Sequence, residues 1–350
     1  MEENLIILNK NLFKDKPKVF LSRDQKINVK KFKEKISLGE YKFEQIDCEY
    51  CKIKNSVIIS KYDRYGLPYS SNLCKSCGLI YTSPRLQQKS YNKFYDDLYR
   101  KIYCDAFSKN TDEEFFKSQI LNGRDIYDFI SQNSNINEIS TVLEVGCGMG
   151  GILVPFKENN INTLGIDYGS KFVEFGRSKN LNLQIGGIEK IKDQTFDCII
   201  YSHVFEHILD LEKELFEIKK RLKPNGILFI AVPGVLNLKK NYFSDLNRFF
   251  QNAHTYNFSL VTLNNILTKS GFSLIKGNEN IEALFINKLI KGKSKTNDFD
   301  RILSKMKIYE SEKKQKSFKI IKKKITELLY IIGLYKITLK IYKILKNKLN

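Results

Sequence analysis

The sequence contains no hydrophobic run long enough to cross a membrane. Its apolar stretches, such as ELLYIIGLYK, stop well short of the roughly 18 residues that a spanning helix needs. The N-terminal segment MEENLIILNK begins with acidic residues and has an apolar run of only four residues, too short for the core of a secretory signal. We therefore expect a cytoplasmic protein.

Acidic residues are scarce, and the excess positive charge is unevenly distributed. The 350 residues include 59 Lys and Arg against 39 Asp and Glu, a formal net charge of +20. Residues 288–350 hold 19 of the basic and five of the acidic residues, a net charge of +14, which leaves +6 for residues 1–287. The basic charge therefore belongs mainly to a C-terminal tail, and the 42% hydrophobic content indicates a buried core elsewhere.

Seven cysteines in a cytoplasmic chain indicate metal ligation or inert burial before disulfides. Two Cys-x-x-Cys pairs, with 22 residues between them, have the spacing of a structural zinc ribbon. Four thiolates close a tetrahedral zinc site and leave no position open for catalysis. The predicted ligands are Cys48, Cys51, Cys74 and Cys77, and Gly78 suits the left-handed turn after the second pair. The alternative is four unrelated buried thiols.

A zinc ribbon can also bind nucleic acid. Residues 61–71, KYDRYGLPYSS, lie between the two cysteine pairs and do not combine exposed aromatics with a dense basic run, as a base-stacking surface would. We therefore expect no nucleic-acid partner.

From about residue 115, strand-like apolar runs alternate with amphipathic helical stretches, a pattern typical of a parallel sheet with helices on both faces. We predict helices at 150–160, 171–180, 210–222 and 260–272, a turn at 223–226 (KPNG), and strands at 141–146, 162–167, 181–186, 195–202, 227–233, 272–277 and 281–287. In such a sheet, ligands bind beyond the carboxyl ends of the strands. The polar and glycine-rich candidate residues follow these strand ends.

The stretch VLEVGCGMGG at 142–151 fits two motifs. The G-x-G-x-x-G of a dinucleotide site is matched by Gly146, Gly148 and Gly151, and the E-x-G-x-G-x-G of an S-adenosylmethionine (SAM) site by Glu144, Gly146, Gly148 and Gly150. A pyrophosphate would lie against this turn in the first case, and a carboxylate at Glu144 would oppose it. SAM carries an ammonium and a sulfonium and no phosphate. Glu144 therefore favours SAM over NAD, whereas Asp167 can take ribose hydroxyls in either case.

Residues 48–287 resemble class I SAM-dependent methyltransferases, and within them a bacterial group with an N-terminal zinc-binding segment. The stretches that carry the resemblance are CEYC, NLCKSCGLIYTSPR followed by YNKFYDDLYR, VLEVGCGMG, FDCIIYSHVFEHILD, RLKPNGILFIAVP and HTYNFSLVTLNNILTKSGF. The resemblance implies an α/β fold with a Rossmann-like seven-stranded sheet, SAM as cofactor, and a sugar or a sugar-nucleotide or surface-glycan precursor as acceptor. We expect O-methylation before C-methylation. The alternatives are a zinc-ribbon RNA methyltransferase or binding protein and an NAD-dependent oxidoreductase.

The resemblance also implies which residues contact the cofactor. The glycine turn with Glu144 borders the methionine moiety, Asp167 holds the ribose, and the loop at Gly187 and Ile188 meets the adenine. Many relatives have an acid where this chain has Gly187, so we expect the adenine amino group to meet backbone or Glu189. The remaining expected cofactor contacts are Cys147, Tyr168, Ser202 and His203.

Only three histidines are present, and two of them are candidates for a catalytic base. Methyl transfer to a hydroxyl needs an acceptor in line with the methyl group and a base for its proton, a task that suits histidine near neutral pH. His207 follows the fourth predicted strand and His254 follows the fifth. The alternative is that Glu206, His207 and His254 only brace their loops. Residues 203–207 also spell the H-x-x-E-H of some zinc peptidases, but that motif requires a continuous helix, whereas we expect His203 in a strand-to-helix loop.

The C-terminal tail has a helical pattern of its own. Within 318–350, apolar residues recur at alternating spacings of four and three: Ile321, Ile325, Leu328, Ile332, Tyr335, Leu339 and Tyr342. Such a lysine-rich amphipathic helix can lie on an anionic membrane surface, here the inner face of the cell membrane, or pack on the protein or on a second copy as a homodimer. The expected segments are 1–40 of unknown role, 41–112 with the zinc ribbon and a linker helix, 113–287 as the SAM-binding domain, and 288–350 as the basic tail.

Overall fold

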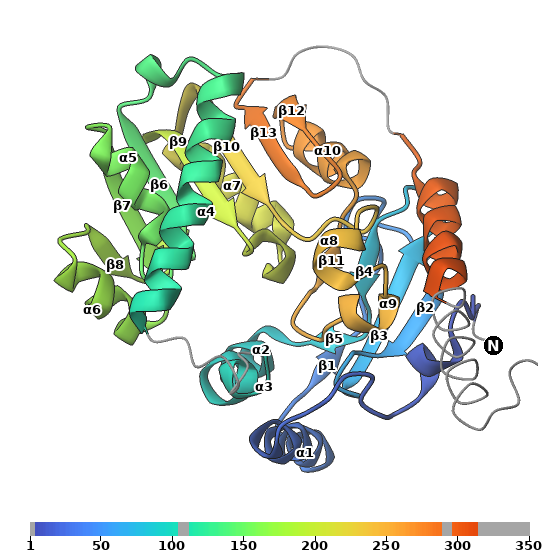
Figure 1. The fold of residues 1–350 in the computed structure, drawn as a ribbon. Coiled ribbons are helices and arrows are strands. Elements are labelled where there is room, and N and C mark those ends of the chain that lie inside the picture. Colours follow the sequence, from blue (N-terminus) through green and yellow to red (C-terminus); the bar gives the residue numbers. More distant parts are fainter. Residues whose placement is uncertain (1–3, 104–111, 289–295, 314–350) are drawn as a thin grey trace, which may run out of the picture.

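The computed structural model describes residues 4–103, 112–288 and 296–313 (Figure 1). Its largest sheet is built from seven strands: β6 (Thr141–Val145), β7 (Asn162–Asp167), β8 (Leu183–Ile185), β9 (Phe196–Ser202), β10 (Leu222–Ala231), β12 (Ser273–Gly277) and β13 (Glu282–Ile286). They lie in the order β12-β13-β10-β9-β6-β7-β8. All neighbours from β10 to β8 are parallel, and β13 is antiparallel to both β10 and β12. The predicted seven-stranded Rossmann-like α/β fold is confirmed.

Helices cover both faces of this sheet. On one face lie α4 (Asp112–Asn133), α5 (Val154–Glu158) and α6 (Ser170–Ser178), and on the other lie α7 (Leu211–Arg221) and α10 (Leu260–Lys269). Successive residues of β9 alternate between the two cores, because side chains along a strand point to opposite faces. Cys198 and Ile200 pack under α4–α6, whereas Ile199 and Tyr201 pack under α7 and α10.

The predicted KPNG turn is part of a strand in the structure. β10 begins at Leu222, and its register with β9 shifts between Leu222 and Ile227. Asn225 has φ of +61°, which bends the backbone locally. The four residues therefore form an irregularity inside β10, since the chain keeps its direction through them.

The N-terminal part forms a second layer beside the large sheet. It contains a short 3-10 helix (Lys10–Phe13), α1 (Arg23–Ser37), α2 (Gln88–Phe94), a π-helical turn (Tyr95–Tyr99), α3 (Arg100–Tyr103), and strands β1 (Phe43–Glu44), β2 (Ser56–Tyr62), β3 (Pro68–Cys74), β4 (Ile80–Thr82) and β5 (Arg85–Leu86). β1 pairs with β5, and the other three strands form an antiparallel sheet with β11 (Tyr256–Asn257), in the order β11-β4-β3-β2. β11 follows two short helices, α8 (Lys239–Tyr242) and α9 (Leu246–Phe249).

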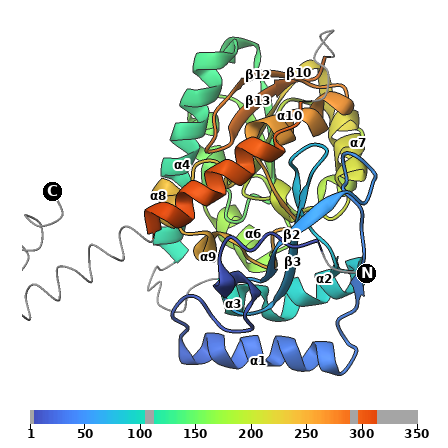
Figure 2. The ribbon, with the colours of Figure 1, turned by 90° about the vertical axis from the view of Figure 1, so that its right-hand side faces the viewer.

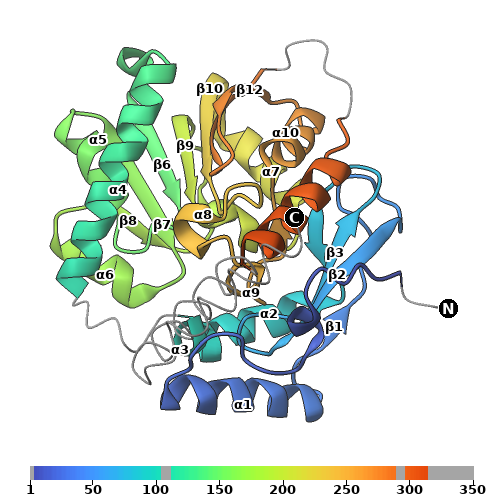
Figure 3. The same cartoon turned by 45° about the vertical axis from the view of Figure 1, so that its right-hand side comes forward.

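Two features join this N-terminal layer to the rest of the chain. β11 comes from the segment predicted as the SAM-binding domain, yet it pairs with β4 through Tyr256 and Tyr81. A helix at 299–313 lies against β2 and β3 (Figures 2 and 3), where Ile302 and Met306 share a buried cluster with Val57. The predicted segments therefore share a sheet and a core, and the boundaries between them stay a prediction.

Residues 318–350, for which we predict an amphipathic helix, lie outside the described residues. Within the described ranges, no helix combines the length and the apolar character that a membrane span requires.

Candidate functional site

The glycine turn after β6 adopts the backbone conformation that its glycines allow. Gly146, Gly148 and Gly150 have φ of +70°, +55° and +77°. A Cβ atom at Gly146 would lie 2.3 Å from Val204 Cγ2, so the turn approaches the segment after β9 closely. The Cys147 side chain points into the core, and its carbonyl accepts a hydrogen bond from Gln119 of α4 at 3.1 Å. This turn and the end of β9 meet where the strand order reverses, the usual ligand position in such sheets.

Glu144 is a buried acid at the end of β6. It is 1% exposed, and its Oε2 atom has no hydrogen-bond partner among the described residues. Burial raises the pKa of Glu144 well above its usual value, and the charge of Asp167 adds to that rise. A cationic ligand would compensate both carboxylates, whereas a phosphate would meet two negative charges.

Asp167, at the end of β7, links the glycine turn to the next loop. Its Oδ2 atom accepts a hydrogen bond from Gly148 N at 2.9 Å, and its Oδ1 atom accepts one from Gly169 N at 2.6 Å. Because a carboxylate oxygen has two acceptor sites, both oxygens retain capacity for ribose hydroxyls.

Gly187 lies between two side chains in the loop after β8. A Cβ atom there would lie 2.3 Å from both the Tyr168 hydroxyl and Glu189 Oε2, so a side chain at this position would displace the ends of these two side chains. The exposed Tyr168 donates a hydrogen bond to Glu189 Oε1 at 3.2 Å, and Ile188 is buried in the core. Glu189 therefore brings a carboxylate to the place where an acid at 187 would have been.

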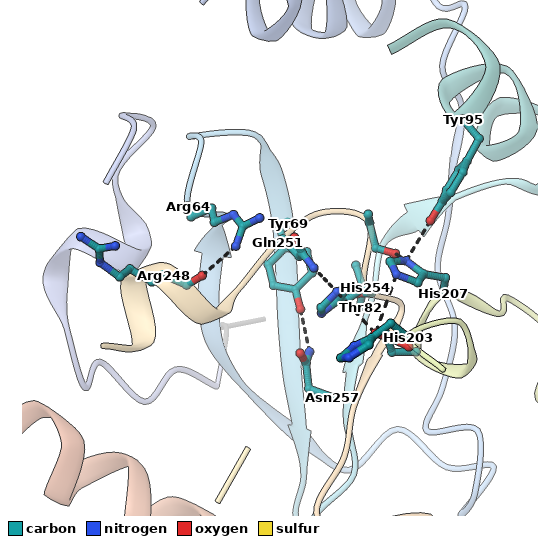
Figure 4. A network of polar contacts seen from close by, with 12 residues as sticks. Arg64, Tyr69, Thr82, Tyr95, His203, His207, Arg248, Gln251, His254 and Asn257 are labelled. Carbon is teal, nitrogen blue, oxygen red and sulfur yellow. Dashed lines mark hydrogen bonds and ion pairs between the residues drawn. The ribbon is translucent and has the colours of Figure 1, made fainter. Parts of the chain in front are cut away.

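The loop after β9 brings the chain's three histidines to one acid (Figure 4). Glu206 is 2% exposed and lies in a 3-10 turn (Phe205–His207). Its Oε1 atom is 3.8 Å from His203 Nδ1, 3.8 Å from His207 Nε2 and 3.9 Å from His254 Nε2. Burial opposes ionisation of Glu206, but the positive charge of His207 and the contacts with the other histidines outweigh it and lower the pKa to about 2.

The histidines differ in their surroundings. His203 is 59% exposed and has φ of +57°, directly after β9. His254 is 2% exposed, contacts Gln251, and has a pKa well below its usual value because of burial and the charge of His207. Ser202, just before His203, accepts a hydrogen bond from Asn122 of α4 at 3.4 Å. Because His203 and His207 do not lie on one continuous helix, the peptidase motif is not formed.

The hydrogen bonds of His207 fix its tautomer. Its Nδ1 atom lies 2.9 Å from the Ala253 carbonyl oxygen, which can only accept, so Nδ1 carries the proton. In the neutral ring, Nε2 then has a free lone pair, directed toward Glu206. His207 therefore presents a proton-accepting atom, Nε2, beside the Glu206 carboxylate.

Our sequence analysis missed a tyrosine stripe that packs on His207. Tyr91, Tyr95, Tyr99 and Tyr103 recur every four residues through α2, the π-helical turn and α3. The Tyr95 hydroxyl lies 2.8 Å from His207 Nδ1, and Tyr91 donates to the His207 carbonyl at 2.7 Å. The spacing alone predicts one helical face. It does not indicate that this face meets a histidine more than 100 positions away.

The four predicted zinc ligands form one cluster. Cys48 Sγ lies 3.6 Å from Cys77 Sγ, and Cys51 Sγ lies 3.9 Å from Cys74 Sγ. Four sulfurs at about 2.3 Å from a tetrahedral zinc ion would be about 3.8 Å apart, so the donor set fits zinc. The contact with Cys74 raises the pKa of Cys48 to about 12, which means that four thiolates need a cation beside them. Gly78 has φ of +84°, as predicted.

A second set of possible metal ligands lies at the histidine cluster. Donor atoms of Glu206, His207 and His254 all lie within 4.8 Å of one another. This set is part of the site described above, at the carboxyl end of β9.

Comparison with known proteins identifies the family. A family profile described as a methyltransferase domain matches residues 83–276, more than half of the chain. The chain belongs to this methyltransferase family. The match spans the glycine turn, Asp167 and the histidine cluster.

Individual relatives match over shorter stretches. A ubiquinone biosynthesis O-methyltransferase from Pelagibacter ubique is 34% identical over 97 residues, which are 26% of this chain and 40% of the relative. A sterol 4-C-methyltransferase from Caenorhabditis elegans is 27% identical over 107 residues, 28% of this chain and 32% of the relative. A SAM-dependent methyltransferase structure from Archaeoglobus fulgidus is 24% identical, with a TM-score of 0.37, and covers 57% of this chain and 90% of its own. The chain thus spans less than half the length of the two curated relatives.

We predict that Glu144→Gln weakens SAM binding about tenfold or more, because the substitution removes the buried charge that faces the cationic ligand. The wild-type affinity should rise with pH as the Glu144 carboxyl, whose pKa burial raises, loses its proton. In the variant this pH dependence should be lost. Calorimetric titration at several pH values measures both effects.

The matched control is Glu174→Gln, an exposed acid on α6. The ligand-free Glu144→Gln protein should be no less stable than wild type near neutral pH. A buried carboxyl with a raised pKa destabilises the fold as pH rises above its unfolded pKa, and glutamine removes that term. Equal SAM affinity in both variants would contradict the role of Glu144.

Proposed function

We propose that this protein transfers a methyl group from SAM to a hydroxyl of a small polar acceptor, a sugar or a sugar-nucleotide or surface-glycan precursor. The proposal rests on two buried acids. Glu144, whose Oε2 atom has no partner among the described residues, lies beside Asp167, and Glu206 lies beside His207, whose proton-accepting tautomer is set by the Ala253 carbonyl. The names of the relatives above include both O- and C-methyltransferases, which supports methyl transfer.

The residues of the glycine turn and of the loops after β7 and β8 would hold the cofactor. Glu144 faces its cationic methionine moiety, Asp167 binds the ribose hydroxyls, and Tyr168 with Glu189 borders the adenine. Bound SAM supplies an electrophilic methyl group on a sulfonium. His207 accepts the acceptor's hydroxyl proton at Nε2, while Ala253 and Tyr95 hold its ring at Nδ1.

Two orphaned acceptors favour a hydroxyl-rich acceptor over a quinone or a sterol. Glu206 Oε2 and Asn257 Oδ1 are both buried with no hydrogen-bond partner among the described residues. Asn257 donates through its Nδ2 to the Tyr69 hydroxyl at 2.8 Å, so its carbonyl oxygen is left for another donor. Buried acceptors of this kind are normally satisfied, and sugar hydroxyls are donors that satisfy them.

We predict that His207→Gln lowers the methyl-transfer rate about 100-fold or more while SAM affinity stays within about twofold, because the substitution removes the base and leaves the cofactor site intact. The assay follows transfer of a labelled methyl group to a panel of nucleotide-linked sugars. His203→Gln, in the same loop but exposed, is the control and should retain turnover at saturating SAM. Wild-type turnover by His207→Gln would exclude His207 as the base.

We also propose that the cysteine cluster binds one structural zinc ion. Cys48, Cys74 and Cys77 belong to the same core as α7 and α10. The ion would therefore hold the N-terminal layer against the large sheet. Contact of residues 318–350 with an anionic membrane surface is a further proposal, which rests on their lysine-rich amphipathic sequence.

The zinc proposal predicts about one zinc ion per chain by elemental analysis, lost in Cys74→Ser together with a lower melting temperature. Cys198→Ala, which removes a lone thiol of β9, should keep its zinc. A zinc-free wild-type preparation that melts at the same temperature as the loaded one would refute the assignment.

A further inference from the structure

A basic cavity lies outside the site described above, beside the N-terminal segment and the end of the 299–313 helix. Its volume is about 400 Å³, and its lining includes Asn247 and four lysines: Lys14, Lys16, Lys18 and Lys313. These residues come from three parts of the chain that are far apart in sequence. No acidic side chain is among the lining residues.

Most of this positive charge has no local counter-charge. Lys313 pairs with Asp245 at 2.6 Å. Lys14, Lys16 and Lys18 have no carboxylate within ion-pair distance in the part of the chain that the structure describes. Lys18 donates instead to the backbone carbonyls of Lys14 and Asp63, both at 2.9 Å. Burial lowers the pKa of Lys18 to about 8, although the charges of Asp63 and Asp15 act to raise it. A bound anion would stabilise the charged form of Lys18.

The nearest buried acid is engaged elsewhere. The Asp63 carboxylate accepts hydrogen bonds from the backbone of Tyr65 and Leu67 through Oδ1, and from Tyr103 and Asn252 through Oδ2. Only its carbonyl oxygen meets Lys18. The Asp63 carboxylate therefore forms no ion pair with Lys14, Lys16 or Lys18, and these three charges remain available to a bound anion.

The chain holds the lysine segment in a defined place. The backbone of Lys16 passes Gly66 so closely that a Cβ atom there would lie 2.8 Å from the Lys16 carbonyl carbon, and Gly66 has φ of +75°. Lys18 N donates to the Arg64 carbonyl at 2.8 Å. Glycine at position 66 is thus required both by its conformation and by this approach.

Positive charge continues from the cavity toward the histidine cluster. Arg64 donates to the Arg248 carbonyl at 3.2 Å (Figure 4). Asn247, the neighbour of Arg248, lines the cavity. Arg64 has no carboxylate partner among the described residues, and its buried Nε atom has no hydrogen-bond partner there. After burial and the charge of His207, the charge of Arg64 is a further cause of the low pKa of His254. Arg64 therefore places a positive charge between the cavity and the histidine cluster.

We propose that this cavity binds a diphosphate group. Lysine ammoniums act as point-charge donors to phosphate oxygens, and three such groups around one hollow, none with an ion-pair partner in the described chain, suit a ligand with several negative charges. The diphosphate can belong to a nucleotide-linked acceptor, an assignment that rests on the function proposed above, or to a free anion. The proposed binding site does not depend on which of these two ligands supplies the diphosphate. It gives the N-terminal residues 11–18 a role.

Calorimetric titration of the full chain with pyrophosphate at physiological salt tests this proposal. The double variant Lys14→Ala/Lys16→Ala should bind pyrophosphate at least about tenfold more weakly than wild type. Lys30→Ala/Lys31→Ala on α1 removes the same charge outside the cavity and should change the affinity less than about twofold. Both lysines of the test pair are exposed, so the variant should fold, and an unchanged melting temperature checks this.

Titrations with a nucleoside diphosphate and with SAM then identify the source of the diphosphate. They also distinguish failure of this proposal from failure of the proposed function. A nucleoside diphosphate that binds more tightly than pyrophosphate, and loses its affinity in the same variant, assigns the site to a nucleotide-linked ligand. Equal affinities for the nucleoside diphosphate and for pyrophosphate would show that the protein recognises the diphosphate alone. Either result supports a diphosphate site in the cavity. SAM affinity should be the same in wild type and variant, whether or not the acceptor is a sugar. No pyrophosphate binding by wild type, or equal loss in the two double variants, would overturn the proposal.

Discussion

Two carboxylates at neighbouring strand ends are the constraint on which this site depends. Glu144 is buried in β6, and the charge of Asp167, the last residue of β7, adds to the rise that burial causes in the pKa of Glu144. A cationic ligand beside the two acids would lower this cost of ionising Glu144. In a dinucleotide site, the same turn faces a diphosphate. Two acidic residues beside that anion would repel it.

The second half of the site also contains a buried acid, and here the neighbouring side chains are histidines. Glu206 is buried, and nitrogen atoms of three imidazoles, from the loop after β9 and the segment before β11, lie within 3.9 Å of its Oε1 atom. The Tyr95 contact comes from the N-terminal layer, so the cysteine-bearing part helps to orient the His207 ring. The pairing of β11 with β4 holds the two layers together within two residues of His254.

Much of this arrangement can be predicted from local sequence. The alternation of apolar runs places β6 to β9 and their helices, because both faces of the sheet are buried. The Cys-x-x-Cys pairs predict the cluster of four sulfurs, because their spacing is typical of tetrahedral zinc sites. The prediction that Glu144 borders SAM follows from charge, because a carboxylate in this turn suits a cationic ligand and opposes a pyrophosphate.

Other features depend on contacts between distant residues and leave no local pattern. His254 reaches Glu206 across 48 positions, and the contact between Tyr168 and Glu189 beside Gly187 is made only when their loops fold together. The KPNG segment has turn chemistry, yet it stays in β10 because the paired strand β9 keeps its direction. The cavity lysines come from segments that carry no motif. In each case, packing between elements determines the structure, and the local conformational preference of the sequence does not.

The central claim is that the turn after β6 accepts a cation-bearing cofactor. Parallel calorimetric titrations of the wild-type protein with SAM and with NAD test it most directly. We predict that SAM binds at about one molecule per chain and that NAD neither binds nor displaces it. Binding of NAD at the same turn, with no binding of SAM, would contradict the account.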